Sequence, residues 1–264
     1  MVKIYLDAGH GGHDGGASAN GIKEKDIVLK IVKKMKSLLN EYQNVDMNFT
    51  RETDVFMSLS ERTKKANNWN ADCYVSIHIN SATNTTARGF ESFRHPNAGS
   101  STTAFQNVMH QEIMGAIGDI RDRGKKTANF HVLRESKMKA ILTENLFISN
   151  NFDANLLKAD AFLDRLAKGH VNGLVKFYGL KKKENAPATE NDGKLYKVQI
   201  GAYEDRKNAD EMEKDLIKQG FNPFVHYENK LYKVQVGAFS NKENAEELAG
   251  KLRTLGYRPF IKYE

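Results

Sequence analysis

The sequence predicts an α/β domain, with a mixed, largely parallel sheet flanked by helices, followed by a small α+β domain of βαββαβ order. Two patterns carry this prediction. Apolar strand-like segments and amphipathic helix-like segments alternate through the first 180 residues, which is typical of an α/β layer fold. Near the C-terminus, two similar segments follow one another, and each contains a strand, a helix and a strand.

Strands of the first domain are expected where short apolar runs end in glycine or polar residues. The run MVKIYLDAG ends in a glycine turn, and ADCYVSIHIN is apolar enough for a strand buried on both faces. The predicted strands are 1–9, 45–51, 71–80, 90–95 and 139–147.

Helices are expected between these strands. In segment 24–42 the residues Ile27, Ile31, Met35 and Leu38 recur at helical spacing and define one apolar side. Further helices are predicted at 58–70, where Ser58 is a suitable N-cap, and at 101–118 and 155–179. The charged segment 121–134 is expected to be a loop before the last strand.

The C-terminal part contains an internal repeat. Residues 195–228 and 231–264 align without a gap at a constant offset of 36 residues, with YKVQIGAY matching YKVQVGAF. One β-α-β unit is too small to cover its own sheet, so we expect the pair to form one domain. The charged segment KKKENAPATENDGK separates it from the rest. The predicted boundaries are therefore a domain at 1–180, a linker at 181–194 and a domain at 195–264.

Composition narrows the class of protein without choosing a function. The formal charge of +7 and the pI near 9.2 suit a polyanionic partner such as nucleic acid, an anionic membrane or an acidic cell wall. The only cysteine, Cys73, lies in an apolar run and is expected to be a buried thiol, so no intrachain disulfide can form. We also expect no membrane span, because no apolar run approaches the roughly 18 residues required.

Polar residues with useful chemistry lie where predicted strands end. His10 closes the first strand, His78 lies near the end of the third, and Glu144 follows the apolar residues of the last. Glu24 begins the first long helix. Because ligands of open α/β sheets bind at the carboxyl ends of the strands, these four residues could meet at one edge.

Two histidines and a carboxylate around an open fourth position are typical of catalytic zinc. A further carboxylate that is not a ligand can act as a general base. The sequence has no HExxH segment that would fix two ligands on one helix, so spacing alone leaves structural roles for the histidines open.

Several motifs resemble, in order, those of the zinc-dependent N-acetylmuramoyl-L-alanine amidases of the Amidase_3 family. They are DAGHGGHDGGA, GIKEKDIVLKI, TRETD, SLSERTKKAN, SIHIN and LTENLFISN, within residues 2 to 178. The resemblance implies that His10, Glu24 and His78 bind Zn²⁺ and that Glu144 is the catalytic glutamate. It also implies hydrolysis of the amide between N-acetylmuramic acid and L-alanine in bacterial peptidoglycan. The chain departs from the family pattern at Lys139 and Asn145, where the family often has proline and glycine.

The C-terminal repeat resembles a SPOR domain, a type that binds peptidoglycan glycan strands. Gln199 and Gln235 alternate with apolar residues and are expected on the sheet face away from the apolar one, where amides suit a hydroxyl-rich glycan. Arg123 and Arg134, in segment 121–134, could bind a carboxylate of the stem peptide. All four could equally be ordinary surface residues.

Three alternatives to the amidase are a zinc peptidase that cuts within the stem peptide, a non-catalytic wall-binding protein and an RNA-recognition protein. An RNA-recognition domain has the same βαββαβ order, but it exposes aromatic residues where this repeat has Gln and Lys, so we expect no nucleic-acid partner. A zinc peptidase that cuts within the stem peptide would use the same metal and base, and only the family resemblance favours the amidase.

The N-terminus lacks the basic region and long apolar core of a secretory signal. We therefore expect a monomer made in the cytoplasm that reaches the wall after lysis or through a holin-type pore. Phage endolysins and mother-cell autolysins of sporulating bacteria both act in this way, and the sequence does not choose between them.

Overall fold

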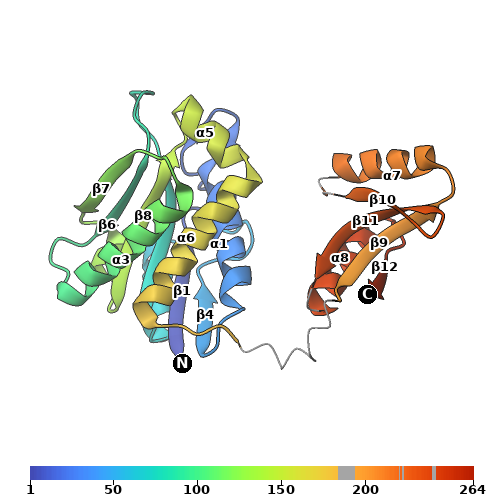
Figure 1. The fold of residues 1–264 in the computed structure, drawn as a ribbon. Coiled ribbons are helices and arrows are strands. Elements are labelled where there is room, and N and C mark those ends of the chain that lie inside the picture. Colours follow the sequence, from blue (N-terminus) through green and yellow to red (C-terminus); the bar gives the residue numbers. More distant parts are fainter. Residues whose placement is uncertain (184–193, 220, 222, 240–241) are drawn as a thin grey trace. The chain divides into compact units, whose positions relative to one another are not determined.

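The computed structural model describes residues 1–183, 194–219, 221, 223–239 and 242–264. The chain divides into two compact units, Met1–Lys183 and Glu184–Glu264 (Figure 1). Most of the segment predicted as a linker, 181–194, lies outside the described residues.

The first unit is built on a six-stranded sheet with the order β4-β1-β5-β8-β6-β7. Neighbouring strands among β4, β1, β5 and β8 are parallel, β6 runs antiparallel to β8, and β7 runs parallel to β6. This confirms the predicted mixed, largely parallel sheet. The strands are β1 (Val2–Ala8), β4 (Val45–Phe49), β5 (Cys73–Asn80), β6 (Phe90–Arg94), β7 (Asp122–Thr127) and β8 (Lys139–Phe147).

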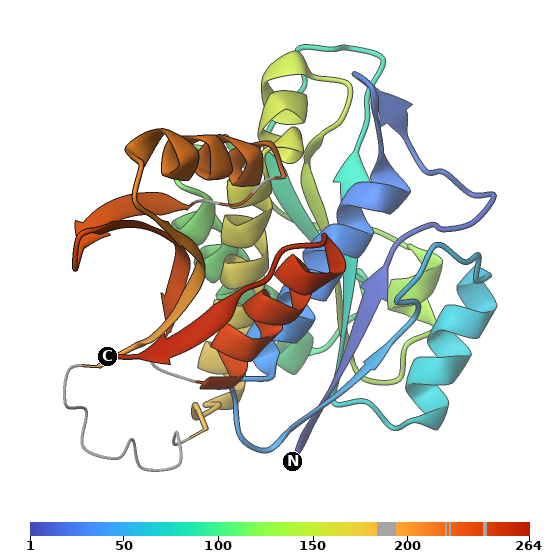
Figure 2. The same cartoon turned by 90° about the vertical axis from the view of Figure 1, so that its right-hand side faces the viewer.

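Helices cover both faces of this sheet (Figures 1 and 2). One face carries α1 (Glu24–Leu39), α3 (Ser100–Ile117) and α6 (Asp160–Tyr178), and the other carries α2 (Leu59–Asn68) and the short α4 (His131–Arg134). The period of two along β1 explains the two cores, since Ile4 and Leu6 pack into the larger one and Tyr5 into the smaller one. Tyr5 stacks there on Tyr74 of β5.

Several element boundaries follow local chemistry. The predicted cap Ser58 forms a capping box with Glu61 at the start of α2. The predicted helix 155–179 is instead two helices, α5 (Asn151–Lys158) and α6, with extended backbone at Ala159 between them. The prediction that residues 121–134 form a loop is wrong, because this segment contains β7 and α4. A short hairpin, β2 (Ser18–Ala19) and β3 (Ile22–Lys23), precedes α1.

The described residues of the second unit have the predicted order, strand, helix, strand, strand, helix, strand. Four antiparallel strands are arranged β10-β11-β9-β12, and apolar side chains of β9 and β11 pack with α7 and α8. The elements are β9 (Tyr196–Tyr203), α7 (Arg206–Lys218), β10 (Phe224–Glu228), β11 (Leu231–Phe239), α8 (Lys242–Thr254) and β12 (Phe260–Tyr263).

Candidate functional site

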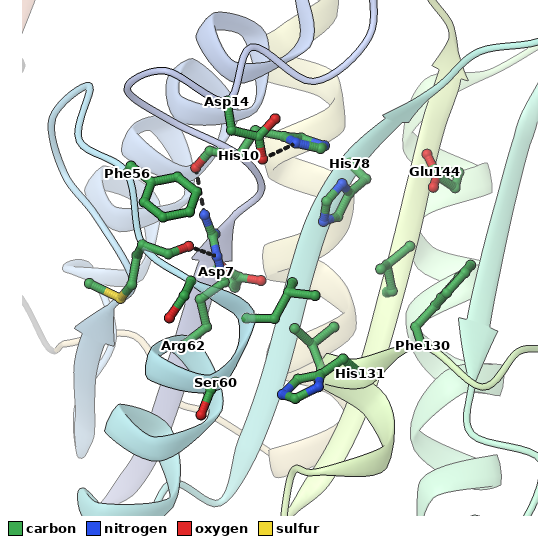
Figure 3. A pocket seen from close by; sticks show the side chains of 15 residues that line it. Asp7, His10, Asp14, Phe56, Ser60, Arg62, His78, Phe130, His131 and Glu144 are labelled. Carbon is green, nitrogen blue, oxygen red and sulfur yellow. Dashed lines mark hydrogen bonds and ion pairs between the residues drawn. The ribbon is translucent and has the colours of Figure 1, made fainter.

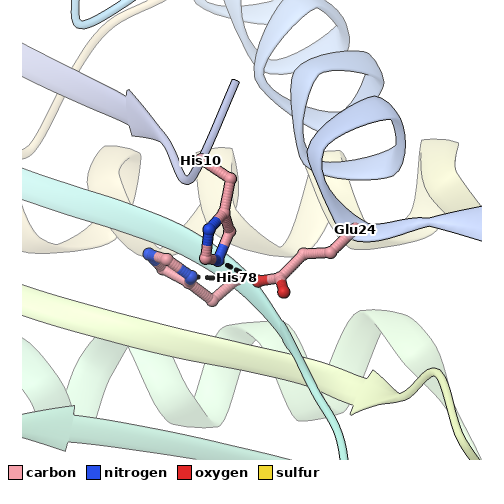
Figure 4. Close-up of side chains that lie close together, drawn as sticks. All are labelled: His10, Glu24 and His78. Atoms are coloured by element: carbon pink, nitrogen blue, oxygen red, sulfur yellow. Dashed lines mark hydrogen bonds and ion pairs between the residues drawn. The ribbon is translucent and has the colours of Figure 1, made fainter. Parts of the chain in front are cut away.

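The carboxyl ends of β1 and β5 and the start of α1 bring His10, Glu24 and His78 together (Figure 4). One ligand atom from each residue lies within 4.8 Å of the others. His10 follows β1, Glu24 is the first residue of α1, and His78 lies on β5. Residues from three separate segments of the chain thus form one cluster that could hold a metal ion.

The two imidazoles converge on the Glu24 carboxylate. His10 Nε2 and His78 Nδ1 lie 3.1 and 3.0 Å from Glu24 Oε1. Although burial opposes ionisation of Glu24, hydrogen bonds from His10 and His78 hold the pKa of this carboxyl well below its ordinary value. Backbone amides of Ala17 and Ile79 also donate to its two oxygens. The carboxylate is therefore ionised and held in position.

Asp14 orients His10 from the other side of the ring. Asp14 Oδ2 lies 2.9 Å from His10 Nδ1, so the Nδ1 proton faces Asp14 and Nε2 faces the cluster (Figure 3). A carboxylate behind a histidine ligand is a common feature of metal sites. Asp14 was not among the residues predicted for the site, although its place four residues after His10 in a glycine-rich turn was a usable signal.

Two glycines leave space for these side chains. A Cβ on Gly9 would lie 2.4 Å from the His78 ring, and one on Gly16 would lie 2.6 Å from Glu24 Oε2 and 2.7 Å from the His10 ring. Gly16 also has a φ of +62°, which other residues rarely adopt. The glycines of the DAGHGGHDGGA segment are thus needed by the geometry of the cluster.

Glu144 lies on β8 directly beside His78 in the register of the sheet, and it is not part of the cluster. Its Oε2 is shielded from solvent and has no hydrogen-bond partner among the described residues. Burial, together with the charges of Glu24 and Glu91, raises the pKa of Glu144 well above its usual value. A shielded carboxyl beside the cluster is suited to accept and return a proton.

Asn145, the departure noted next to Glu144, is buried and points back into the sheet. Its amide donates to the backbone oxygen of His78 at 3.0 Å and to the hydroxyl of Thr143 at 3.0 Å. This side chain therefore supports the strand that carries His78 and does not crowd Glu144.

A cavity of about 720 Å³ adjoins the cluster, and His10, His78 and Glu144 line it (Figure 3). The opposite wall comes from the segment before α2, from α2 itself and from α4. Its apolar lining residues are Phe56, Met57, Leu59, Phe130, Val132 and Leu142. Phe56, Leu59 and Phe130 are substantially exposed, so the cavity is open to a ligand from solvent.

Arg123 and Arg134 do not line this cavity. Arg123 Nε donates to the buried Glu91 at 3.1 Å, and its guanidinium lies over the ring of Phe147. Arg134 bonds to Asn129 and Glu135 near the surface. Their role in substrate binding stays a prediction.

In the second unit, Gln199 and Gln235 are neighbours on β9 and β11, and only 1% and 4% of their surfaces are exposed. Phe260 pairs with Gln199 on one side, and Phe224 pairs with Gln235 on the other. Both phenylalanines are about half exposed. A row of four residues thus crosses the sheet, with amides at its centre and aromatic rings at its ends. Both glutamines are therefore buried, whereas polar residues on an ordinary strand surface are solvated.

Comparison with known proteins identifies both units. Residues 4–176 match the family Amidase_3, N-acetylmuramoyl-L-alanine amidase, and residues 154–227 and 228–264 match the SPOR domain. The chain is 48% identical over 226 residues to the sporulation-specific N-acetylmuramoyl-L-alanine amidase of Bacillus subtilis, covering 85% of this chain and 84% of that protein. It is 49% identical over 195 residues to the endolysin of Bacillus phage SPP1, covering 72% and 71% of the two chains.

Solved structures agree with these matches. The catalytic domain of CwlV, an N-acetylmuramoyl-L-alanine amidase from Bacillus (Paenibacillus) polymyxa, superposes with a TM-score of 0.66 at 35% identity. The match covers 69% of this chain and all of that structure. None of the helices within the described residues is long and apolar enough to cross a membrane. The chain belongs to the Amidase_3 family and is an N-acetylmuramoyl-L-alanine amidase, a peptidoglycan hydrolase, with a SPOR domain.

Proposed function

We propose that His10, Glu24 and His78 hold a zinc ion and that Glu144 is the general base for hydrolysis of the bond between N-acetylmuramic acid and L-alanine. The observation that carries this proposal is the cluster itself, in which two imidazole nitrogens and a carboxylate oxygen lie within 4.8 Å of one another beside an open cavity. Two nitrogen donors and one oxygen donor fit the ligand preference of catalytic zinc.

The proposed chemistry divides between the metal and the chain. When bound, zinc acts as a Lewis acid that polarises the amide carbonyl and makes water more acidic. Glu144 takes a proton from the water that attacks the carbonyl carbon. It then gives that proton to the nitrogen of L-alanine as the carbon–nitrogen bond breaks. The products are a carboxylate on the muramic acid side and a free amino group on the stem peptide.

The shielded position of Glu144 supports this role. A carboxyl group with a raised pKa holds the proton long enough to deliver it to the leaving amine, and general acid–base catalysis of this kind contributes about 10²–10⁴ in rate. The apolar wall of the cavity excludes water around the scissile bond. A stem peptide that lies between this wall and the zinc ligands would place its first amide at the cluster.

We propose that the second unit binds glycan strands through the row Phe224, Gln235, Gln199 and Phe260. Aromatic rings suit the apolar faces of sugars, and amides can both donate to and accept from hydroxyl groups. Gln199 Nε2 is a buried donor with no partner among the described residues, and a ligand oxygen would supply the missing acceptor. Tethering such a binder to the amidase raises the local concentration of the catalytic unit on an insoluble wall.

The site of action that we propose is the bacterial cell wall, reached by a monomer after lysis of the cell or through a holin-type pore. The similarity to an endolysin and to a sporulation-specific amidase supports this setting.

The test separates metal binding from catalysis. The variant Glu144→Gln keeps the shape of the side chain but removes the base, so we expect about one equivalent of zinc and a loss of turnover of about 10²-fold or more. The control, His78→Ala, should lose zinc. Turnover of Glu144→Gln at the parent rate would contradict the role of Glu144, and full zinc content in His78→Ala would contradict the ligand set.

A further inference from the structure

Two arginines lie buried behind the cluster, and neither has a role in the proposed hydrolysis. Arg51 follows β4 and Arg62 lies on α2, and each is 3% exposed. Burying a cation is costly unless it is paired or fully hydrogen-bonded. Two such groups beside one small site therefore need a structural or functional reason.

Arg51 connects the two chain segments that carry His10 and Glu24. Its Nη2 donates to the backbone oxygen of Gly9 at 2.8 Å and to that of Lys25 at 2.7 Å. Gly9 precedes His10, and Lys25 follows Glu24. A single guanidinium nitrogen thus joins the loop after β1 to the first turn of α1.

Arg62 holds the same loop from α2. Its Nη2 donates to the backbone oxygen of His10 at 2.6 Å, and its Nη1 donates to that of Ala8 at 2.9 Å and to the carboxylate of Asp7 at 2.8 Å. His10 has a φ of +60°, a conformation that costs a residue with a Cβ about 1 kcal/mol or more. The bond to its carbonyl offsets part of this cost.

The charges are arranged to keep both arginines fixed. Asp7 is fully buried and also accepts hydrogen bonds from Thr50 and Ser76 at 2.6 Å each. Arg62 therefore has an anionic partner, whereas the guanidinium of Arg51 donates to backbone oxygens. Only the planar guanidinium has enough donors in fixed directions for such a set, so lysine cannot replace either residue without losing bonds.

We propose that Arg51 and Arg62 are positioning residues that fix the spacing between His10 and Glu24 before the metal ion binds. This inference rests on the proposed zinc site. The two ligands belong to different elements. Without the bonds from Arg51 and Arg62, the segments that carry His10 and Glu24 would have to become ordered when the metal binds. Groups that orient ligands from behind typically change metal affinity by 10- to 100-fold.

The test compares Arg51→Lys with a control variant that weakens the fold elsewhere. Ile113→Ala removes a buried side chain from α3, which packs mainly on α6, β6, β7 and β8. Zinc affinity is measured by competition with a chelator, and stability is followed through the fluorescence of Trp69, the only tryptophan of the chain. We expect the dissociation constant for zinc to rise 10- to 100-fold in Arg51→Lys and less than twofold in the control.

A second measurement keeps the inference testable whether or not zinc binds. In the metal-free protein, backbone amides of residues 9–16 should exchange with solvent at least tenfold faster in Arg51→Lys than in Ile113→Ala. Arg62→Lys provides the same comparison if Arg51→Lys does not fold. Equal zinc affinity and equal exchange in variant and control would overturn the inference. Failure of the parent protein to bind zinc, with faster exchange still present in the variant, would instead overturn the proposed metal site alone.

Discussion

His170 makes the stability of the catalytic unit depend on pH. It is fully buried on α6, and its Nδ1 donates to the backbone oxygen of Leu166 at 2.7 Å while its Nε2 lies 3.0 Å from the Thr143 hydroxyl. Burial lowers the pKa of His170 from 6.5 to about 4. The unfolded chain therefore binds a proton at a higher pH than the folded chain does, and stability falls as the pH drops from about 6.5 to about 4.

The size of this effect follows from the two pKa values. The full difference corresponds to about 3 kcal/mol of unfolding free energy, of which about 2 kcal/mol is lost at pH 5. For a unit of this length, a loss of that size lowers the melting temperature by about 4–8 °C. The neutral variant His170→Gln should lack this contribution, whatever its stability at pH 7.

The assay is urea unfolding of the metal-free protein at pH 7 and pH 5, followed by Trp69 fluorescence, which reports on the first unit only. All other titrating groups are shared, so the parent should lose about 2 kcal/mol more than His170→Gln between the two pH values. Equal losses in both proteins would refute the argument from burial.

Three further predictions concern the two units. Gly16→Ala should weaken zinc binding measured by chelator competition by about tenfold or more, because its Cβ would meet both Glu24 and His10; unchanged affinity would show that the loop adjusts freely. The double variant Phe224→Ala and Phe260→Ala should pellet less with purified glycan strands, while its hydrolysis of a soluble muropeptide stays at the parent rate. Undiminished pelleting would contradict glycan binding by the row. Removal of residues 184–264 should likewise leave hydrolysis of soluble muropeptides unchanged but slow the clearing of intact walls. Equal clearing by the shortened and the full chain would contradict a targeting role for the second unit.

The sequence was sufficient to predict five of the six strands of the first sheet and the convergence of the four principal residues. Apolar runs ending in polar groups identify strands and their carboxyl ends, and parallel strands bring those ends to one edge. His10, His78 and Glu144 were therefore expected near one another, and His10 and His78 form one cluster with Glu24 at the start of α1. The zinc and base roles came from the family resemblance, since no local spacing distinguishes a metal ligand from a structural histidine.

What the sequence did not predict depends on long-range contacts. Strand β7 consists of polar and charged residues without alternation, and its strand conformation is set by pairing with β6. The helical pattern of the sequence continues through Ala159, so no local sequence signal predicts the break between α5 and α6 there. The bonds from Arg51 and Arg62 to the segments that carry His10 and Glu24 were missed because their acceptors are backbone oxygens, which every residue type has.

In the second unit, the alternation of polar and apolar residues along the strands predicted only part of the arrangement. It predicted Gln199 and Gln235 on the face away from the apolar one, but it could not show that both are almost completely buried. Burial in a small sheet depends on which residues its edge strands supply. The pairing of Phe224 and Phe260 with the two glutamines thus became visible only in the folded unit.

The most direct test of the account is mass spectrometry of peptidoglycan digested by the zinc-loaded protein. We predict released stem peptides that begin with a free amino group on L-alanine, together with glycan strands whose muramic acid residues carry a free carboxylate. Chelation of the metal should abolish both products. Stem peptides cut at an internal bond, with L-alanine still attached to muramic acid, would contradict the assignment and indicate a peptidase at the same cluster.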